Sequence, residues 1–488
     1  MTKIDHQLDI KIPGLDKQLI AGRWTDPSPA EYPVISPSTE QIIANTSAVT
    51  IEDAEKAVLS ARKAFDSGSW SNLSIEERVI HCSKLCDAME SRLGDLNRAW
   101  ALESGPTLSH AEIINNNVGV TIWRRMLDTA VELDWSEHRD DVLLLREPIG
   151  TVLSIMTFNG PIVLMAMKII PAMLAGCTVI GKHAPESQLT SRLLSEAIEE
   201  ADIPPGVLTL LPAGTEVTQH LVSHSGIDMV SLTGGTEIGI EVIKRTADRL
   251  ARTTLELGGK SPAIILEDAN IAETIDTLVP GSTAYMGQVC VSLSRILAPT
   301  ERYAELIEAL AEKYSTFILG DPLDAGVDQG PIATERGLLR TELAVEKAKQ
   351  QGARVVAGGG RPTELEQGWW YQPTLLDNVN NSMDIAQVEV FGPVTAVIPY
   401  SGVEDAIKLA NDSDFGLAAS IYGTDSDECM RVAKRLQSGS VAINTAGISF
   451  LQPFGGYKKS GWGRECGPEG ILEFTQIKQV IGSKGPNS

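Results

Sequence analysis

Short apolar runs alternate with amphipathic stretches through the middle of this 488-residue chain, beginning at Pro148. The apolar runs predict strands at Gly150–Met156, Cys177–Lys182, Val207–Leu211 and Met229–Thr233. The amphipathic stretches between them predict helices at Pro161–Ala175, Gln188–Ala201, Val217–Ser223 and Thr236–Ala251. Apolar strands separated by helices indicate a parallel, doubly wound sheet that is covered on both faces. Such sheets bind their ligands at the carboxyl ends of the strands.

A second alternating region follows and predicts another α/β unit. Its helices are expected at Ile271–Met286, Thr300–Ser315, Glu335–Gly352 and Val403–Asn411. Its strands are expected at Ser261–Leu266, Arg295–Pro299, Arg354–Ala357, Val394–Tyr400, Ala418–Tyr422 and Val441–Asn444. Before Pro148 the pattern predicts helices at Ser74–Leu96 and Ala111–Val131, and near the C-terminus it predicts a strand at Gln476–Ile481.

Composition narrows the possible classes of protein. The length fits two or three domains, and the net charge of −23 disfavours binding to nucleic acid. The apolar stretch Ile162–Ile180 is interrupted by Lys168, Pro171 and Gly176, so it predicts a buried helix and no membrane span. The six cysteines are scattered, Met1–Ile20 has no signal-peptide pattern, and a cytoplasmic location follows as the expectation.

Two glycine-bearing motifs carry the most specific chemistry. The first runs Leu255-Glu256-Leu257-Gly258-Gly259-Lys260-Ser261-Pro262, and the second runs Gly287-Gln288-Val289-Cys290-Val291-Ser292. Glu256 and Cys290 are 34 positions apart. A thiolate attacks carbon, and the covalent adduct then needs a base that activates water, so the pair supplies both groups. Metal binding finds no support, because His220 and His224 lack the glutamate that completes the metalloprotease pattern.

These motifs and four others, in the same order, resemble the aldehyde dehydrogenase superfamily over roughly Leu19 to Lys478. The other four are Phe158–Pro161, Thr233–Glu237, Glu389–Pro393 and Pro453–Lys458. The resemblance implies an α/β fold with a Rossmann-type cofactor domain, an α/β catalytic domain and a small β oligomerisation flap. It places the NAD(P)-binding domain at 1–128 and 149–256, the catalytic domain at 257–460, and the bridging segments at 129–148 and 461–488. It also implies a homodimer or homotetramer.

The resemblance assigns three catalytic roles. Cys290 is the expected nucleophile, Asn159 the expected donor to the oxyanion, and Glu256 the expected base for thioester hydrolysis. Taken without the resemblance, the three residues have ordinary alternatives: a buried structural cysteine, a turn asparagine before Gly-Pro, and a carboxylate about 20 residues after Gly234-Gly235 that binds ribose. The spacing to Cys290 favours the base.

Cofactor contacts are implied in the same way. Gly234-Gly235 follows an apolar strand and opens a helix, where free amides suit a pyrophosphate. The expected cofactor-binding residues are Lys182, Gly214, Gly234, Gly235, Thr236, Gly239, Leu257, Glu389 and Phe391. NAD-preferring relatives often carry Glu three residues after the lysine, whereas this chain has Pro185 there and Glu186 next. NAD is the expected cofactor, and NADP stays open.

The positions that match the substrate pocket carry no charge. They are Gly160, Val163, Leu164, Met167, Val289, Val291, Ile448, Phe450 and Phe454. Many relatives have large rings where this chain has Gly160 and Met167, so we expect a bulky, hydrophobic aldehyde as substrate and a carboxylic acid as product. Three alternatives remain open at this point: a semialdehyde dehydrogenase, a catalytically idle structural relative, and a cofactor-independent thiol esterase.

Overall fold

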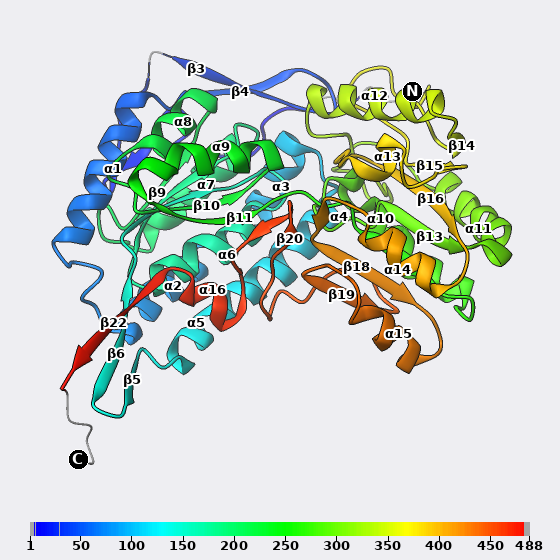
Figure 1. The fold of residues 1–488 in the computed structure, drawn as a ribbon. Coiled ribbons are helices and arrows are strands. Elements are labelled where there is room, and N and C mark those ends of the chain that lie inside the picture. Colours follow the sequence, from blue (N-terminus) through cyan, green and yellow to red (C-terminus); the bar gives the residue numbers. More distant parts are fainter. Residues whose placement is uncertain (1–3, 5, 29, 483–488) are drawn as a thin grey trace.

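Two large β-sheets with helices on their faces dominate the computed structural model, which describes residues 4, 6–28 and 30–482 (Figure 1). The first sheet has six strands in the order β21-β11-β10-β7-β8-β9. Its parallel strands are β7 (Thr151–Ile155), β8 (Thr178–His183), β9 (Leu208–Pro212), β10 (Met229–Thr233) and β11 (Arg252–Glu256), and β21 (Gly461–Trp462) joins the edge antiparallel to β11. This arrangement confirms the doubly wound sheet that the alternating pattern predicts.

Helices pack on both faces of this sheet because β7, β8, β9 and β10 each place apolar side chains in the clusters on the two faces. One face is covered by α1 (Ile51–Asp66), α8 (Thr215–Ser223) and α9 (Thr236–Thr246). The other face is covered by α2 (Ile75–Glu90), α5 (Val120–Glu132), α6 (Pro161–Leu174) and α7 (Gln188–Glu200). All 14 residues of α6 are buried, as expected for the interrupted apolar stretch.

The second large sheet has seven strands in the order β14-β15-β16-β13-β12-β18-β19. Its strands are β12 (Pro262–Ile265), β13 (Arg295–Pro299), β14 (Arg354–Ala357), β15 (Thr374–Asp377), β16 (Val394–Tyr400), β18 (Ala418–Tyr422) and β19 (Ser440–Ile443). The accompanying helices are α10 (Ile271–Thr283), α11 (Tyr303–Ser315), α12 (Glu335–Gln350), α13 (Asp384–Gln387), α14 (Val403–Asn411) and α15 (Ser426–Ala433). The sequence pattern missed β15, α13 and α15, which are short.

Smaller elements complete the described part of the chain. Two short antiparallel pairs lie near the N-terminus: β1 (Leu19–Ile20) with β2 (Arg23–Trp24), and β3 (Glu31–Ile35) with β4 (Ile42–Ser47). A third pairs β17 (Phe415–Gly416) with β20 (Tyr457–Lys458). The remaining helices are α3 (Leu93–Ser104), α4 (Leu108–Glu112), a π-helical turn (Ile113–Gly119) that joins α4 to α5, and α16 (Gly467–Leu472).

A three-stranded sheet projects from the body of the molecule (Figure 1). It consists of β5 (Ser136–Arg139), β6 (Val142–Pro148) and β22 (Thr475–Ile481), with β22 antiparallel to β6. The predicted strand near the C-terminus is therefore confirmed, and the structure pairs it with the segment before residue 148. The last six residues of the predicted bridging segment, 483–488, lie outside the described residues.

Two helix predictions were wrong in their bounds. The expected helix Ser74–Leu96 divides into α2 and α3, because the Ser91 hydroxyl bonds the carbonyl of Ala88 and ends the first helix. The expected helix Ile271–Met286 stops at Thr283. The prediction for Thr300–Ser315 is confirmed, with a 3-10 turn at Thr300–Arg302 before α11.

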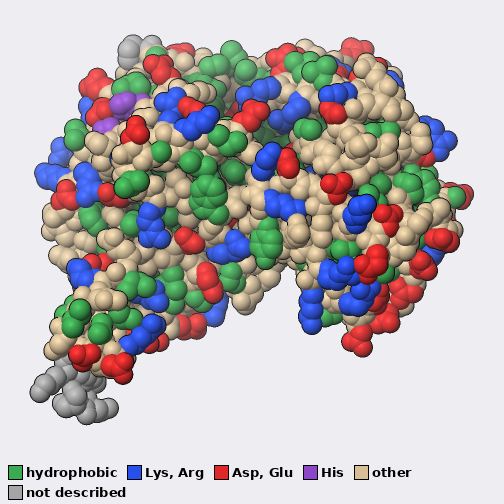
Figure 2. All heavy atoms as spheres, viewed as in Figure 1, with side chains coloured by type: hydrophobic (Ala, Val, Ile, Leu, Met, Phe, Trp, Pro, Cys, Tyr) green, Lys and Arg blue, Asp and Glu red, His purple; other side chains and the backbone are tan. Residues whose placement is uncertain are grey.

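The face of the molecule drawn in Figure 2 shows no separation of charge by sign. Acidic and basic side chains are interspersed over the face in Figure 2, despite the net charge of −23. Across the part of the chain that the structure describes, no helix has both the length and the hydrophobicity that crossing a membrane requires.

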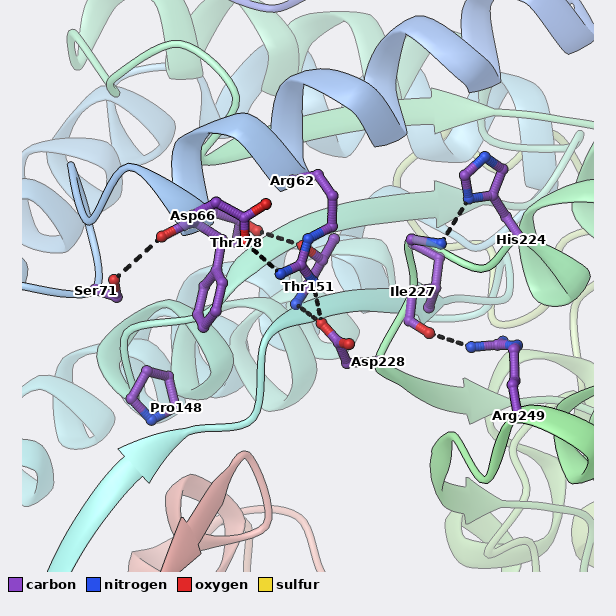
Figure 3. Close-up of polar contacts among 12 residues, drawn as sticks. Arg62, Asp66, Ser71, Pro148, Thr151, Thr178, His224, Ile227, Asp228 and Arg249 are labelled. Atoms are coloured by element: carbon purple, nitrogen blue, oxygen red, sulfur yellow. Dashed lines mark hydrogen bonds and ion pairs between the residues drawn. The ribbon is translucent and has the colours of Figure 1, made fainter.

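Asp228 ties the amino ends of the first sheet's strands to α1. Its carboxylate accepts a hydrogen bond of 2.7 Å from the amide of Thr151 and pairs with the guanidinium of Arg62 (Figure 3). Gly150 lies directly against it: a Cβ at this glycine would sit 1.9 Å from Oδ2 of Asp228, and the backbone has φ +138°. Since Asp228 is held by two partners, it cannot move aside freely.

We therefore expect Gly150→Ala to lower the free energy of unfolding by about 2 kcal/mol through this clash and an unfavourable φ. Gly94 in α3 is the matched control, because a Cβ there meets nothing within 4 Å. Gly94→Ala should raise stability by about 0.5 kcal/mol. Urea unfolding followed by circular dichroism measures both; equal midpoints for the two variants would contradict the prediction.

Candidate active site

Glu256 is the last residue of β11 and lies at the carboxyl edge of the first sheet. Its side chain is buried, and neither carboxylate oxygen has a hydrogen-bond partner among the described residues. The amide of Gly234, which follows the neighbouring strand β10, donates to the Glu256 carbonyl at 3.0 Å. A buried carboxylate with both oxygens free is costly unless a ligand or water meets it, so this position indicates a functional group.

The two glycines after Glu256 bring three segments together. A Cβ at Gly259 would lie 2.5 Å from the carbonyl oxygen of Cys290, and a Cβ at Gly258 would lie 2.1 Å from Oε2 of Glu389. The amide of Gly259 donates to the other oxygen of Glu389 at 3.1 Å. Only glycine, which has no Cβ, allows neighbouring atoms to come this close to its backbone. The structure thus places the predicted thiol, the predicted base and Glu389 around one glycine turn.

The segment before Cys290 is a left-handed turn. After α10 ends at Thr283, Tyr285, Met286 and Gly287 have φ of +46°, +55° and +64°. Gly287 packs against the main chain of Gly392, 2.3 Å from where its Cβ would be. The sequence predicted a helix through Met286 because Tyr and Met rarely adopt positive φ, and only tertiary contacts reveal the turn.

Asn159 lies beside the same loop. Its amide nitrogen donates to the carbonyl of Gln288 at 2.9 Å, and its Oδ1 accepts from the Thr157 hydroxyl at 2.7 Å. These two bonds fix which end of the amide points toward the loop. A side-chain amide has two N–H groups, so one is left for an oxygen near Cys290.

Burial and nearby negative charge raise the pKa of both Cys290 and Glu256. Desolvation, together with repulsion of the thiolate by the carboxylates of Glu389 and Glu256, raises the pKa of the Cys290 thiol to about 12. Burial likewise raises the pKa of Glu256 well above its ordinary value, and the neighbouring charge of Glu465 adds to this. In the ligand-free protein the Cys290 thiol therefore stays protonated at neutral pH, and Glu256 holds its proton more tightly than an ordinary carboxyl does.

A buried ion pair near Glu256 influences the pKa of this carboxyl. The sequence interpretation did not identify this pair. Lys168 in α6 pairs with Glu465, both fully or almost fully buried, and its ammonium also donates to Ser231 at 3.3 Å. The positive charge of Lys168 opposes the rise in the pKa of Glu256. The available signal was a lysine in the middle of an apolar helix, since a buried charge needs a partner.

The predicted cofactor residues gather at the carboxyl edge of the first sheet. Lys182 is the second-to-last residue of β8 and is almost fully buried, and its ammonium has no hydrogen bond or ion pair to any described residue. Burial lowers its pKa to about 8, and the negative charge of Glu186 opposes this change. An unpaired, buried ammonium facing a carboxylate at longer range has the chemistry to bind hydroxyl or phosphate oxygens.

Two helices begin at this edge with open space before them. Gly214 and Gly235 occupy the N-cap positions of α8 and α9, and a Cβ at either would meet nothing within 4 Å. Gly234 precedes the second cap, and Thr236 is the first residue of α9. Free amides at a helix start suit an anion, so these residues fit a nucleotide pyrophosphate.

Gly239 and Phe391 have packing roles that the sequence left open. A Cβ at Gly239 would lie 2.8 Å from the side chain of Leu257, so the glycine lets α9 approach β11. Phe391 has φ +53° and meets Phe158 edge to face at 6.2 Å. Phe391 therefore joins the Glu389 loop to the Asn159 turn.

The predicted pocket positions are brought together, with one exception. Val163, Leu164, Met167 and Phe454 are buried in one hydrophobic cluster, and Cys290, Val291, Ile448 and Phe450 pack against it. Gly160 caps the start of α6, from which three of these side chains project. Val289 packs elsewhere, in a separate cluster with Trp100 and Tyr285. Cys290 thus packs against an apolar cluster and also lies close enough to Glu389 and Glu256 to feel their charges.

One cluster among the described residues has the ligand chemistry of a metal site: Glu55 with His220 and His224. Nε2 of His220 lies 2.7 Å from one oxygen of Glu55, and Nε2 of His224 lies 3.3 Å from the other. The amide of Gly226 donates to Nδ1 of His224 at 2.9 Å. In neutral His224 this contact puts the proton on Nε2, where it points to Glu55, so the arrangement favours hydrogen bonding over metal ligation.

We expect alkylation of Cys290 by iodoacetamide to keep rising with pH beyond pH 9, because a pKa of about 12 leaves about a thousandfold less thiolate at pH 8 than an ordinary thiol has. Glu389→Gln removes a like charge, lowers the thiol pKa and should raise the rate at pH 8. Exposed Glu312 provides the control, Glu312→Gln. Peptide-resolved mass spectrometry measures the rates; a profile that levels off below pH 9 would refute the assignment.

Known proteins share this whole arrangement of strands. Residues 24–480 match the sequence profile of the Aldehyde dehydrogenase family. The geranial dehydrogenase of Castellaniella defragrans is 37% identical over 467 residues, which cover 94% of this chain and 97% of that protein.

Solved structures agree over a similar span. A Mycobacterium tuberculosis aldehyde dehydrogenase complexed with NAD+ superimposes with a TM-score of 0.93 at 39% identity, covering 96% of this chain and 98% of that one. A mutant of aldehyde dehydrogenase C from Pseudomonas syringae, complexed with NAD+ and octanal, gives a TM-score of 0.92 at 33% identity and covers 98% and 99%. With a matching profile over most of its length and relatives of this similarity, the chain belongs to the aldehyde dehydrogenase family.

Proposed function

We propose that this protein uses NAD to oxidise a bulky, hydrophobic aldehyde to the carboxylic acid, with Cys290 as nucleophile, Asn159 as oxyanion donor and Glu256 as base. The observation that carries the proposal is the glycine turn Gly258–Gly259, whose backbone touches the Cys290 carbonyl and Glu389 directly after Glu256. Glu256, Cys290 and Glu389 lie in three separate segments of the chain. The turn brings these segments together at the carboxyl edge of the first sheet, where α/β proteins bind their ligands.

The first step forms a carbon–sulfur bond. Cys290 gives up its proton to water as its sulfur bonds to the aldehyde carbon, and the carbonyl oxygen takes the negative charge beside the free N–H of Asn159. NAD, when bound, would accept the hydride that leaves this carbon as the oxygen reforms its double bond, which would leave a thioester on Cys290. Lys182, the glycines at the starts of α8 and α9, and Glu389 would hold the cofactor.

The second step frees the enzyme. Glu256 takes a proton from water, the resulting hydroxide attacks the thioester carbon, and the carbon–sulfur bond breaks to release the acid. A base needs a pKa near the working pH, and burial raises that of Glu256 toward this range, while Lys168 limits the increase. The unpartnered oxygens of Glu256 leave room for that water.

The substrate class follows from the side chains around the thiol. Val291, Ile448 and Phe450 pack with Cys290 against the buried cluster that contains Met167 and Phe454, and none of them carries a charge. Relatives named for geranial and complexed with octanal act on or bind apolar aldehydes, which agrees with this surface. A substrate carboxylate would find no arginine or lysine among these positions.

We further propose a cytoplasmic homo-oligomer, with the six-stranded sheet and its helices as the cofactor domain. All six cysteines are free, which fits a reducing compartment. Apolar side chains at Ile477 and Ile481 are exposed on β22 of the projecting sheet, with exposed fractions of 60% and 75%. Exposed apolar strand residues of this kind commonly mark an interface between subunits.

The function is tested by assaying a panel of aldehydes with NAD and with NADP, following absorbance of the reduced cofactor. We expect kcat/KM for octanal, geranial or benzaldehyde to exceed that for succinic semialdehyde by about tenfold or more, because a charged carboxylate finds no partner in the apolar site. NAD should be preferred, since Glu186 near Lys182 repels a 2′-phosphate. Cys290→Ala should abolish activity with every substrate; a preference for the semialdehyde would refute the substrate class.

Glu256→Gln should separate the two steps. Hydride transfer does not need this base, so the variant should give one burst of reduced cofactor per active site. Steady-state turnover should then fall by about a hundredfold or more, as expected when a general base is removed. Stopped-flow absorbance measures the burst, and Glu312→Gln is the control; an undiminished steady-state rate would show that another group activates water.

A further inference from the structure

The end of α3 holds the segment that follows Lys182. The carboxylate of Glu103 accepts hydrogen bonds from the amides of Leu189 and Thr190, at 2.7 and 3.0 Å, and so caps α7 from another helix. The hydroxyl of Ser104 donates to the carbonyl of Glu186 at 2.9 Å. Glu103 and Ser104 are both buried. The position of the proposed cofactor segment thus depends on two adjacent residues of α3.

The same helix end holds both segments that carry the proposed catalytic groups. The carbonyl of Ser104 accepts a 2.8 Å hydrogen bond from the hydroxyl of Tyr285, in the loop that leads to Cys290. One turn earlier, the indole of Trp100 donates to the carbonyl of Phe158 at 2.8 Å, directly before Asn159. Ser104 is therefore bonded on one side to the Lys182 segment and on the other to the thiol loop.

Tyr285 needs such an anchor because its backbone is in an unfavourable region. Its φ and ψ are +46° and +47°, and those of Met286 are +55° and +37°. Non-glycine residues occupy this region only where surrounding contacts fix them. The amide of Met286 bonds to Gln329 at 3.1 Å, and the ring of Tyr285 meets Trp100 edge to face at 5.6 Å. The hydrogen bond from the Tyr285 hydroxyl to Ser104 connects this turn directly to α3.

We infer that the end of α3 couples the Lys182 segment to the Cys290 loop, and that Tyr285 is the positioning residue through which this coupling reaches the thiol. Occupancy of the Lys182 segment shifts Ser104 through its hydroxyl, and Ser104 holds Tyr285 through its carbonyl. The inference rests on the proposed function for the identity of the cofactor, while the positioning of Cys290 by Tyr285 is independent of it.

The first test uses protein without cofactor. Tyr285→Phe removes one hydroxyl and keeps the ring, and Tyr400→Phe is the matched control: Tyr400 is equally buried and donates to the carbonyl of Ile265 at 2.7 Å, on strands of the other sheet. Iodoacetamide labelling of Cys290, read by peptide mass spectrometry, should be about fivefold faster in Tyr285→Phe, as the loss of one hydrogen bond allows. Tyr400→Phe should match the unchanged protein. Equal rates in the two variants would overturn the positioning role.

The second test measures the coupling with NAD as the probe. In the unchanged protein, saturating NAD should change the labelling rate of Cys290 by about fivefold or more, an ordinary coupling between sites. Ser104→Ala removes the bond to Glu186 and keeps the carbonyl that Tyr285 uses. In Ser104→Ala and in Tyr285→Phe the effect of NAD should shrink to below about twofold, with no further loss in the double variant, because both act in one chain of contacts.

Direct NAD binding, followed by tryptophan fluorescence, separates the possible failures. A full NAD effect on labelling in either single variant overturns the coupling, as does the absence of any effect in an unchanged protein that binds NAD. An unchanged protein that neither binds nor reduces NAD overturns the proposed function instead, and the cofactor-free comparison of Tyr285→Phe with Tyr400→Phe still decides whether Tyr285 positions the thiol.

Discussion

Close main-chain packing at Gly258 and Gly259 is the constraint on which the site depends. The carbonyl of Cys290 and the carboxylate of Glu389 occupy the volume where side chains would stand. A Cβ at Gly259 would push the thiol loop away from the end of β11, and a Cβ at Gly258 would push Glu389 away. Because packing is dense, the two glycines of this turn set how closely the Cys290 and Glu389 loops approach Glu256.

The site also concentrates charge in a buried place, which is costly for stability. Glu256, Glu465, Lys168 and Lys260 are all buried, and the ammonium of Lys260 has no hydrogen-bond partner among the described residues. Replacing such groups with apolar residues often stabilises a protein, so their presence indicates selection for chemistry over stability. Burial and the charge of Glu465 raise the pKa of Glu256, and the charge of Lys168 opposes this rise.

Left-handed backbone conformations and buried charged side chains occur together around Cys290. The left-handed turn at Tyr285 and Met286, the φ of +53° at Phe391 and the charged cluster at Glu256 all lie around Cys290. The amino edge of the same sheet, by contrast, is held by ordinary satisfied contacts such as those of Asp228 with Thr151 and Arg62. Three of the left-handed non-glycine residues, Tyr285, Met286 and Phe391, thus lie around the proposed nucleophile, together with the buried charges.

Hydrophobic periodicity by itself determined the doubly wound sheet, most helices and the strand at the C-terminus, because these depend on local patterns of burial. The spacing of Glu256 and Cys290 within glycine motifs indicated the chemistry, and the resemblance assigned Asn159, Lys182 and Glu389 to one site. Tertiary structure decided the rest: the left-handed turn at Tyr285, the Lys168–Glu465 pair, and the contacts of Ser104. These features join residues tens to hundreds of positions apart, and no local pattern records which distant backbone atom a side chain will meet.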